Sequence, residues 1–261
     1  MRRTLTIAAL ALLAVPLAGT KPATAERLVT SISRHQVLVN SNFAGTSIVL
    51  FGTIEPDSPA ARRRTGYDLV VTVTGPKQTI VERRKERMLG IWTNVGQRTF
   101  LNVPSYLAVL SNQPLEQITS ADAVRQNQLG LADKLLPQQL GNDVGDVSRD
   151  DPFRANFIRL KTQHQLYVQK TNGVTLLTPT VFRAEIPLPA ETPVGNYDVD
   201  IKAFADGALL TRTNSAFEIV KVGFEQFVAN AAQDYGLLYG LTTAMMALMT
   251  GWFASVVFRR D

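Results

Sequence analysis

An uncharged stretch at the C-terminal end of the sequence most constrains what this chain can form. From Tyr235 to Phe258 it holds 24 residues without one Asp, Glu, Lys or Arg, and Arg259-Arg260-Asp261 follow at once. At about 1.5 Å of rise per residue, a helix of this length reaches roughly 36 Å, more than a hydrocarbon core about 30 Å thick. The sequence therefore predicts one transmembrane helix over residues 235–258, with the lipid bilayer as a partner.

The first 25 residues have the pattern of a secretory signal peptide. Two arginines precede an apolar run from Leu5 to Val15, and Ala23-Thr24-Ala25 lies just before Glu26. The apolar run is too short to span a bilayer as a helix, and small residues at alternate positions suit signal peptidase. We expect residues 1–25 to be removed; an uncleaved anchor is the alternative.

The two ends together predict a single-pass topology. With the signal removed, residues 26–234 lie across the membrane and residues 259–261 remain inside as a short tail. Arg259 and Arg260 are then on the cytoplasmic side, in agreement with the positive-inside tendency. These two arginines therefore fix the predicted orientation of the span.

Charge and composition exclude several classes of function. The formal net charge of +5 falls to +2 without the three basic residues of the signal, so nucleic acid is not expected as a partner. Cysteine is absent, which excludes thiol catalysis, disulfides and thiolate metal sites. The outer part has about 209 residues, enough for one well-packed domain or two small ones.

Apolar and polar residues alternate on both sides of a middle segment, which predicts a β-sandwich over residues 26–222. The alternation covers residues 28–39, 47–54, 67–74, 181–187, 196–205 and 209–222. Asp206-Gly207 is typical of a hairpin turn, and Tyr197 follows a Pro-rich stretch that resembles the tyrosine corner of immunoglobulin-like domains. We predict a mainly β fold with some α, an immunoglobulin-like β-sandwich with a helical insertion; two separate β modules are the alternative.

The middle segment, about residues 112–173, changes to helical spacing. Thr119 and Asp122 resemble a capping box at the start of a short helix that ends near Gly130. Asp151 is a good N-cap for a second helix, and Asn172-Gly173 would end it. Residues at spacings of three and four predict one buried face on that helix: Phe153, Phe157, Leu160, His164 and Tyr167.

Residues 223–234 are expected to form a juxtamembrane helix that leads into the span. An apolar stripe runs from Phe224 to Ala231, and no Pro or Gly separates it from Tyr235. An unbroken helix would hold the outer domain at a fixed angle to the membrane and close to the lipid, unlike a flexible stalk.

Small residues recur at helical spacing along the predicted span. Such a face lets two helix backbones approach closely, where dispersion and weak Cα hydrogen bonds hold them together. The residues of this face are Gly236, Gly240, Ala244, Ala247, Gly251 and Ser255. They predict packing against a second copy of the chain or against another membrane protein, although Gly and Ala are also common in spans generally.

Few residues offer chemistry. His35 and His164 are the only histidines, too few for a three-histidine metal site. His35 is expected in a loop and His164 in the helix core with a bonded ring nitrogen; alternatively, His164 joins Arg154 and Arg159 in contacting a ligand. No nucleophile, base or metal-ligand pattern occurs, so we expect no enzyme, no catalytic residue, no metal and no cofactor.

Two kinds of charged cluster have an ordinary interpretation and a functional one. Four acidic residues are expected in a solvated loop, or else around a hard cation: Asp143, Asp146, Asp150 and Asp151. Basic runs at residues 62–64 and 83–87 are expected at strand ends, where charge discourages pairing between sheets. Contact with anionic headgroups or an acidic partner is the alternative for these basic runs.

Several segments of the sequence resemble one known family. They are Phe43-x-Gly-Thr46, Phe153-Arg-x-x-Phe-x-Arg-Leu160, Phe182-Arg-Ala-x-Ile-Pro-Leu-Pro189, Pro193-x-Gly-x-Tyr197 and Gly251-Trp-Phe-Ala254. Together they resemble the uncharacterised alphaproteobacterial putative transmembrane protein family, from about Leu28 to the end of the chain. The resemblance implies an inner-membrane protein whose outer domain faces the periplasm, without established catalytic residues. Some members look to be encoded near a sulfite-exporter type permease, which implies a transporter accessory.

The sequence thus predicts a single-pass inner-membrane protein with most of its chain in the periplasm. We expect an accessory or scaffold protein for a membrane partner such as a transporter. The alternative is a periplasmic module that binds a small anion or a glycan.

Overall fold

The computed structural model describes residues 26–56, 66–141, 143–146, 148–223, 228 and 232–258. The predicted signal peptide, the basic run at residues 62–64, most of the predicted juxtamembrane helix, and Arg259 and Arg260 lie outside the described residues. The described part is mainly β, with several sheets and one C-terminal apolar helix, which confirms the predicted fold class.

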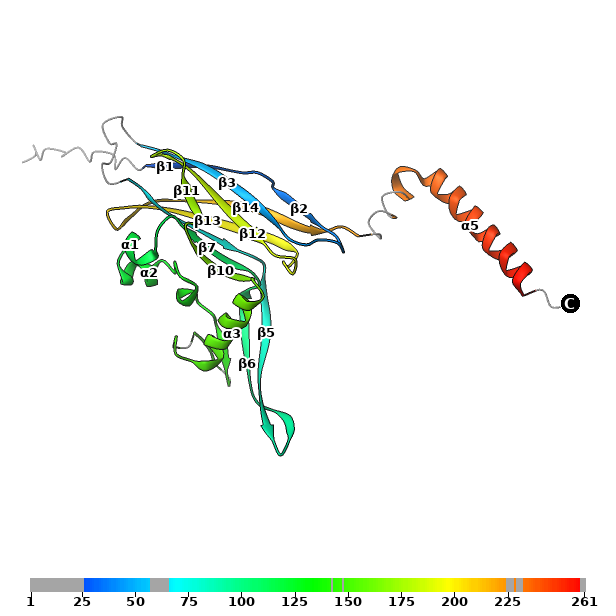
Figure 1. Cartoon of the computed structure of the whole chain (residues 1–261), viewed down its shortest axis with the longest axis horizontal. Helices are drawn as coiled ribbons and strands as arrows, with labels where there is room; N and C mark the ends of the chain where they lie inside the picture. Colours follow the sequence, from blue (N-terminus) through cyan, green and yellow to red (C-terminus); the bar gives the residue numbers. More distant parts are fainter. Residues whose placement is uncertain are drawn as a thin grey trace, which may run out of the picture.

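Two sheets face each other as layers of a sandwich (Figure 1). The first sheet has the order β1 (Arg27–Ile32), β3 (Thr46–Glu55), β12 (Val181–Leu188) and β11 (Val174–Leu176). The second has the order β10 (Tyr167–Thr171), β7 (Leu107–Ser111), β4 (Asp68–Thr74), β13 (Gly195–Ala205), β14 (Ala208–Lys221) and β2 (Gln36–Val39). Strands from before and after the insertion share both sheets, so they form one sandwich and not two modules.

Alternating side chains of both sheets meet in one apolar core. Leu50 of β3 and Ile201 of β13 are both fully buried there, as expected for strands with one face on the core. The Tyr197 hydroxyl donates to the Pro193 carbonyl at 2.6 Å, which is the backward bond that the corner motif predicts. Asp206 and Gly207 both have positive φ in the turn between β13 and β14, so the predicted hairpin is present.

The segment over residues 112–173 is less helical than predicted. It contains α1 (Leu115–Ile118), α2 (Ala121–Gln126), a 3₁₀ turn η2 (Leu131–Asp133), β8 (Gln138–Leu140), β9 (Asp143–Gly145) and α3 (Pro152–Gln163). The N-cap of α2 is Ser120, whose hydroxyl accepts from the Ala123 amide. Thr119 is buried and donates to the Gly207 carbonyl instead, so the predicted cap was one residue too early.

Helix α3 begins as predicted and ends earlier. The Asp151 carboxylate caps it by accepting from the Arg154 amide at 2.9 Å. The helix stops at Gln163 because Gln165 takes a left-handed conformation (φ 56°), and Tyr167 then enters β10 beside β7. Asn172 has φ 64°, but it turns the chain from β10 in one sheet to β11 in the other.

A long hairpin, which we call the arm, projects from the sandwich (Figure 1). It consists of β5 (Lys77–Met88) and β6 (Ile91–Pro104), and β8 and β9 extend it into a third sheet. Only Thr99 and Phe100 of β6 pair with β8. The Phe100 ring stacks on Phe157 of α3, 4.4 Å between centroids, so the base of the arm is packed against the insertion.

The C-terminal helix α5 (Gly236–Val257) has 22 residues and could cross a membrane by length and composition. No residue of α5 is buried, which distinguishes it from the core helix of a soluble domain. Tyr235 has φ −131° and ψ 43°, so the chain leaves helical conformation there. The prediction that one unbroken helix leads into the span is therefore wrong, because the helix is interrupted at Tyr235.

Candidate functional site

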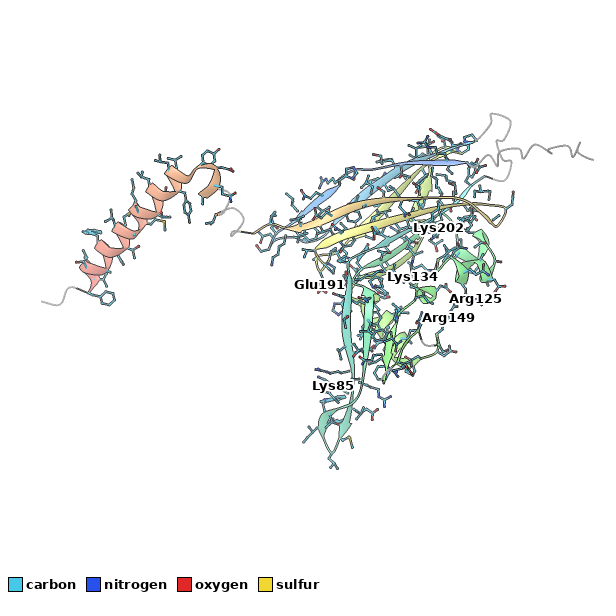
Figure 2. All side chains as sticks on the ribbon, turned by 180° about the vertical axis from the view of Figure 1, so that it is seen from behind. Lys85, Arg125, Lys134, Arg149, Glu191 and Lys202 are labelled. Carbon is cyan, nitrogen blue, oxygen red and sulfur yellow. The ribbon has the colours of Figure 1, made fainter. Side chains whose placement is uncertain are left out.

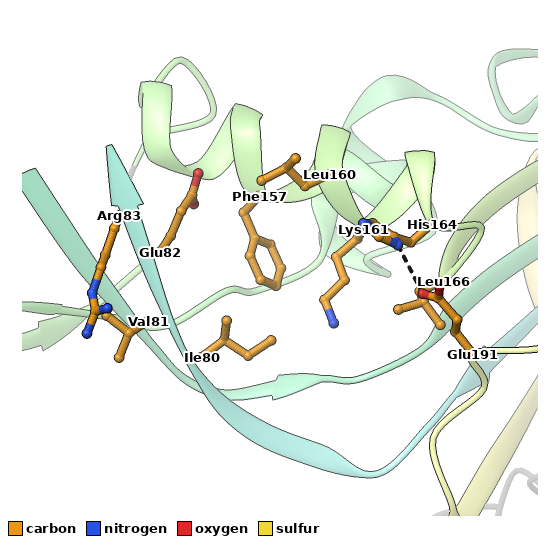
Figure 3. Close-up of a pocket in the computed structure, with 10 residues that line it drawn as sticks. All are labelled: Ile80, Val81, Glu82, Arg83, Phe157, Leu160, Lys161, His164, Leu166 and Glu191. Carbon is orange, nitrogen blue, oxygen red and sulfur yellow. Dashed lines mark hydrogen bonds and ion pairs between the residues drawn. The ribbon is translucent and has the colours of Figure 1, made fainter. Parts of the chain in front are cut away.

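A groove of about 450 Å³ lies between β5 and α3 (Figure 3). Its apolar lining comes from Ile80 of β5, from Phe157 and Leu160 of α3, and from Leu166 just after the helix. Charged side chains share the same groove: Glu82, Arg83, Lys161, His164 and Glu191. An apolar floor with a few charged groups is the usual composition of a small-molecule site.

Lys161 carries the positive charge inside this groove. Figure 3 shows its side chain extending from α3 between Phe157 and Leu166. The ammonium donates to the Ser105 carbonyl at 3.3 Å and lies 5.8 Å from the centre of the Phe157 ring. Burial lowers the pKa of Lys161, because a half-buried ammonium has lost part of its hydration. A bound anion would compensate for that loss.

Glu82 is the partly buried acidic group of the groove, whereas Glu191 is exposed. Its Oε2 atom is buried and has no hydrogen-bond partner among the described residues. Burial, with a smaller contribution from the Asp151 charge and against the opposing Arg159 charge, raises the pKa of Glu82 to about 7. The side chain therefore changes its protonation state near neutral pH, and the charge of the groove changes with it.

His164 lies at the rim of the groove and not in the helix core. Its Nδ1 atom is 3.0 Å from Oε2 of Glu191, and both side chains are more than half exposed. The expectation of a buried ring is wrong because α3 ends at Gln163, which leaves His164 as the C-cap. The expectation that a ring nitrogen of His164 has a hydrogen-bond partner is met by Glu191.

The structure separates the two arginines that were expected beside His164. Arg154 is buried and pairs with Asp146, while its Nη2 atom donates to the carbonyls of Ala132 and Lys134 at 3.2 and 2.6 Å. These bonds connect α3 to the chain at and just after η2, so the guanidinium is not available to a ligand. Arg159 is exposed and lines a smaller adjoining hollow of about 200 Å³.

The acidic cluster is used within the fold. Asp151 caps α3 and Asp146 pairs with Arg154 while accepting from the Leu136 amide at 3.3 Å. Among the residues that the structure describes, no group of three or more His, Asp or Glu side chains could hold a metal ion. Asp146 and Asp151 therefore act as structural acceptors, and Asp143 and Asp150 are exposed to solvent, as expected of a solvated loop.

A buried charge cluster elsewhere on the second sheet is also satisfied internally. Lys202 is 5% exposed and donates to Asp200 at 2.6 Å, and Arg212 donates to the other oxygen of the same carboxylate at 2.6 Å. Figure 2 labels Lys134 and Lys202. Burial, followed by the nearby Lys202 charge, lowers the pKa of Lys134. Because the carboxylate is already shared, this cluster offers less to a ligand than the groove does.

The end of the arm exposes large apolar side chains. Met88, Leu89, Ile91 and Trp92, which we call the tip, are between 57% and 103% exposed. The basic run at residues 83–87 lies in the last part of β5, which ends at Met88, and Figure 2 labels Lys85 in this part of the arm. The tip was not predicted from the sequence, because Leu89-Gly90 lacks the Asn, Asp or Gly that usually precedes the glycine of a two-residue hairpin turn.

The small-residue face of α5 is open. An added Cβ at Gly236, Gly240 or Gly251 would meet nothing within 4 Å. Ala244, Ala247 and Ser255 are exposed on the same helix. No described part of the sandwich, insertion or arm covers this face.

A family described as "Putative transmembrane protein" (Alph_Pro_TM) matches residues 27–260. The chain belongs to this family. The match includes the sandwich, the insertion, the arm and α5, which confirms the predicted resemblance and agrees with a membrane protein that crosses once through α5.

Other comparisons add little. The N-terminal domain of the adhesin Sgo0707 from Streptococcus gordonii is 9% identical, with a TM-score of 0.28 over 74% of this chain. The chain spans only 32% of that solved structure. No curated protein matches the sequence.

Proposed function

We propose that the chain is a single-pass inner-membrane accessory protein whose β domain faces the periplasm. In this proposal α5 packs against a membrane partner, either a transporter or a second copy of the chain. The observation that carries it is the open small-residue face of α5, on which Gly236, Gly240 and Gly251 have no neighbour within 4 Å of an added Cβ.

The physical reason is close approach of helix backbones. In lipid, apolar side chains gain little by leaving the acyl chains, so association depends on tight packing between helices. Glycine and alanine at spacings of three and four over about five turns leave a shallow groove for a second helix. A bulky residue on this face would separate the two backbones.

Crosslinking from the span tests this proposal. A photoreactive residue at Ala247 should capture a partner in intact cells, and Gly240→Leu should reduce capture several-fold. The matched control is Thr242→Leu, which adds a leucine on the opposite side of α5. Equal recovery with both variants would refute packing through the small-residue face.

The proposed orientation has its own test. A reporter that is active only in the cytoplasm should work when fused after Asp261, because the predicted tail with Arg259 and Arg260 is expected inside. Activity of a periplasmic reporter at the same position would reverse the topology.

A second candidate function, small-anion binding, is supported by the Lys161 ammonium within the groove between β5 and α3. An aromatic anion could place its ring against Phe157 and its charge beside Lys161, where the hydration lost by burial would be replaced. His164 and Arg159 would then be rim contacts, and Arg154 would have no role in binding.

Ligand-dependent stabilisation of the full chain in mild detergent checks this second candidate. Sulfite, sulfate and benzoate are suitable probes, because a ligand that binds the folded state alone raises its apparent stability. Lys161→Met should remove any thermal shift, whereas Arg125→Met, distant on α2, should not. A flat response to all three anions in the wild type would count against the candidate.

A further inference from the structure

We propose that the tip of the arm inserts into the outer leaflet of the bilayer that α5 crosses, as a second membrane contact of the chain. This inference rests on the proposed topology, in which the domain and the arm lie on one side of the membrane. The occupant of the tip is the lipid itself, with anionic headgroups around the strands behind it.

The first argument is exposure on both faces of the hairpin. Arg87 pairs with Trp92 and Met88 pairs with Ile91 across the strands, so the apolar side chains of the tip point to opposite faces. A sheet that docks on a flat protein surface needs one apolar face. Met88 and Ile91 share one face, and Trp92 lies beside Arg87 on the other. Exposed apolar side chains on both faces suit a medium that surrounds the hairpin end, as acyl chains do.

The second argument is the conformation of the turn. Leu89 has φ 50° and is fully exposed, followed by Gly90 with φ 87°. A two-residue turn of this kind favours Asn or Asp before the glycine, and a leucine there pays for left-handed backbone without any contact inside the protein. Such a strained and uncovered apolar residue points to a function outside the fold.

The third argument is charge behind the tip. Arg83, Arg84, Lys85 and Arg87 accompany a single acidic residue, Glu86, in this part of β5. Arg87 and Lys85 lie one and three residues behind Met88, about 3 and 10 Å along the strand. The headgroup layer is roughly 5–8 Å thick on each side, so Lys85 would lie just beyond it and reach anionic headgroups with its long side chain while the tip meets the acyl chains. The Nε atom of Arg87 donates to the Gly90 carbonyl at 3.3 Å, which keeps this guanidinium beside the turn, at the level of the interface.

The arm is also free to reach the membrane. Phe153 of α3 approaches the strands at Gly96, where an added Cβ would lie 3.4 Å from its ring. The register shifts between Arg84 and Lys85, and such a bulge bends a hairpin. The tip lies beyond this point.

The connection to α5 permits the contact. Fourteen residues separate Lys221 at the end of β14 from Gly236, and an extended chain of that length spans at most about 50 Å. The arm, with 12 residues in β5, is about 40 Å long. The helix break at Tyr235 means that α5 alone does not set the tilt of the domain, and a second contact would set it.

Fluorescence of Trp92 tests the inference in the full chain. Trp252→Phe leaves Trp92 as the single tryptophan. The protein is reconstituted into phosphatidylethanolamine and phosphatidylglycerol vesicles with lipids brominated on the acyl chains. We expect strong quenching of Trp92 in the wild-type arm. The double variant Leu89→Asp with Ile91→Asp should reduce this quenching at least about twofold. Changing three of the four basic residues to Gln should also reduce it, measured in vesicles at low salt.

A matched control separates a specific contact from mere proximity. Leu177 is 56% exposed on the sandwich, and Leu177→Asp should leave the quenching unchanged. Absence of quenching, or equal quenching in the tip variant, would overturn the inference, as would capture of a protein by a photoreactive residue at position 92 in cells. None of these outcomes affects crosslinking from α5, so failure at the tip is distinguishable from failure of the accessory role.

Discussion

The sandwich and the arm are both largely antiparallel β structure, yet apolar side chains are buried in the sandwich and exposed in the outer half of the arm. In β7 of the sandwich all five residues from Leu107 to Ser111 are buried, whereas in the arm Ile91 and Trp92 are about two-thirds exposed. The core between the two sheets covers one face of β7, and residues of the insertion cover the other. Beyond Gly96 no described element covers the arm.

The difference distinguishes the part of the chain that apolar burial stabilises from the part that it does not. Apolar burial stabilises the sandwich by roughly 25 cal/mol for each Å² removed from water. The tip gains nothing of this kind inside the protein. Substitutions in the sandwich should therefore lower stability more than substitutions in the tip. At one position of the tip, a substitution should raise stability.

Phe182→Ala should produce the largest loss of stability. The Phe182 ring is fully buried and lies against Gly52, where an added Cβ would come within 2.4 Å of it. Removing such a ring leaves a cavity and costs about 3–5 kcal/mol. Urea unfolding of the full chain in mild detergent, followed by circular dichroism, measures the loss. Trp92→Ala in the arm is the control and should change stability by less than about 0.5 kcal/mol; similar losses would erase the contrast between the regions.

Tyr197→Phe should have an intermediate effect. The variant keeps the aromatic packing, including the stacking on Phe217 at 4.9 Å, and loses the hydroxyl that donates to the Pro193 carbonyl. Leaving that carbonyl unpaired costs about 1–2 kcal/mol. The same unfolding experiment checks it, with Tyr239→Phe in α5 as a control for loss of an exposed hydroxyl. An unchanged urea midpoint would mean that the hydrogen bond between Tyr197 and Pro193 does not stabilise the fold.

Much of the sandwich could be predicted from the sequence, because its strands have one buried face. The alternation of Tyr197, Val199, Ile201 and Ala203 with polar residues is a local signal, and the structure places these four side chains in the core. The span was equally predictable, since length and absence of charge are local properties. Both predictions needed no knowledge of distant contacts.

The insertion was harder because tertiary contacts decided its boundaries. Tyr167 continues the helical spacing of α3, but its hydroxyl bonds to the Pro104 carbonyl at 2.7 Å and its strand pairs with β7. For the candidate site, the sequence identified His164 and Arg159 near the groove. It missed Lys161 and Glu82, because only the packing of α3 against the distant strand β5 brings these two side chains to one groove.

Glu82→Gln should change how stability depends on pH. The pKa of Glu82 rises in the folded chain from an ordinary 4.5 to about 7, so the folded state holds its proton more strongly than the unfolded state. Stability in the wild type should therefore fall as pH rises from about 4.5 to about 7. Solvent screening at this partly buried site keeps the effect to about 1 kcal/mol. The variant should lose this slope, measured by urea unfolding at pH 5 and pH 8, and Glu86→Gln on the same strand should keep it.

Leu89→Asn should have the smallest effect and the opposite sign. Asparagine tolerates the left-handed conformation that Leu89 adopts (φ 50°) and forms a favoured turn with Gly90. The variant should gain about 0.5–1 kcal/mol in urea unfolding, while quenching of Trp92 by brominated lipid should decrease. Because Leu89 is fully exposed, no packing is lost to offset the relief. A variant that becomes less stable would mean that the leucine serves the fold after all, and the distinction between the sandwich and the tip would no longer hold.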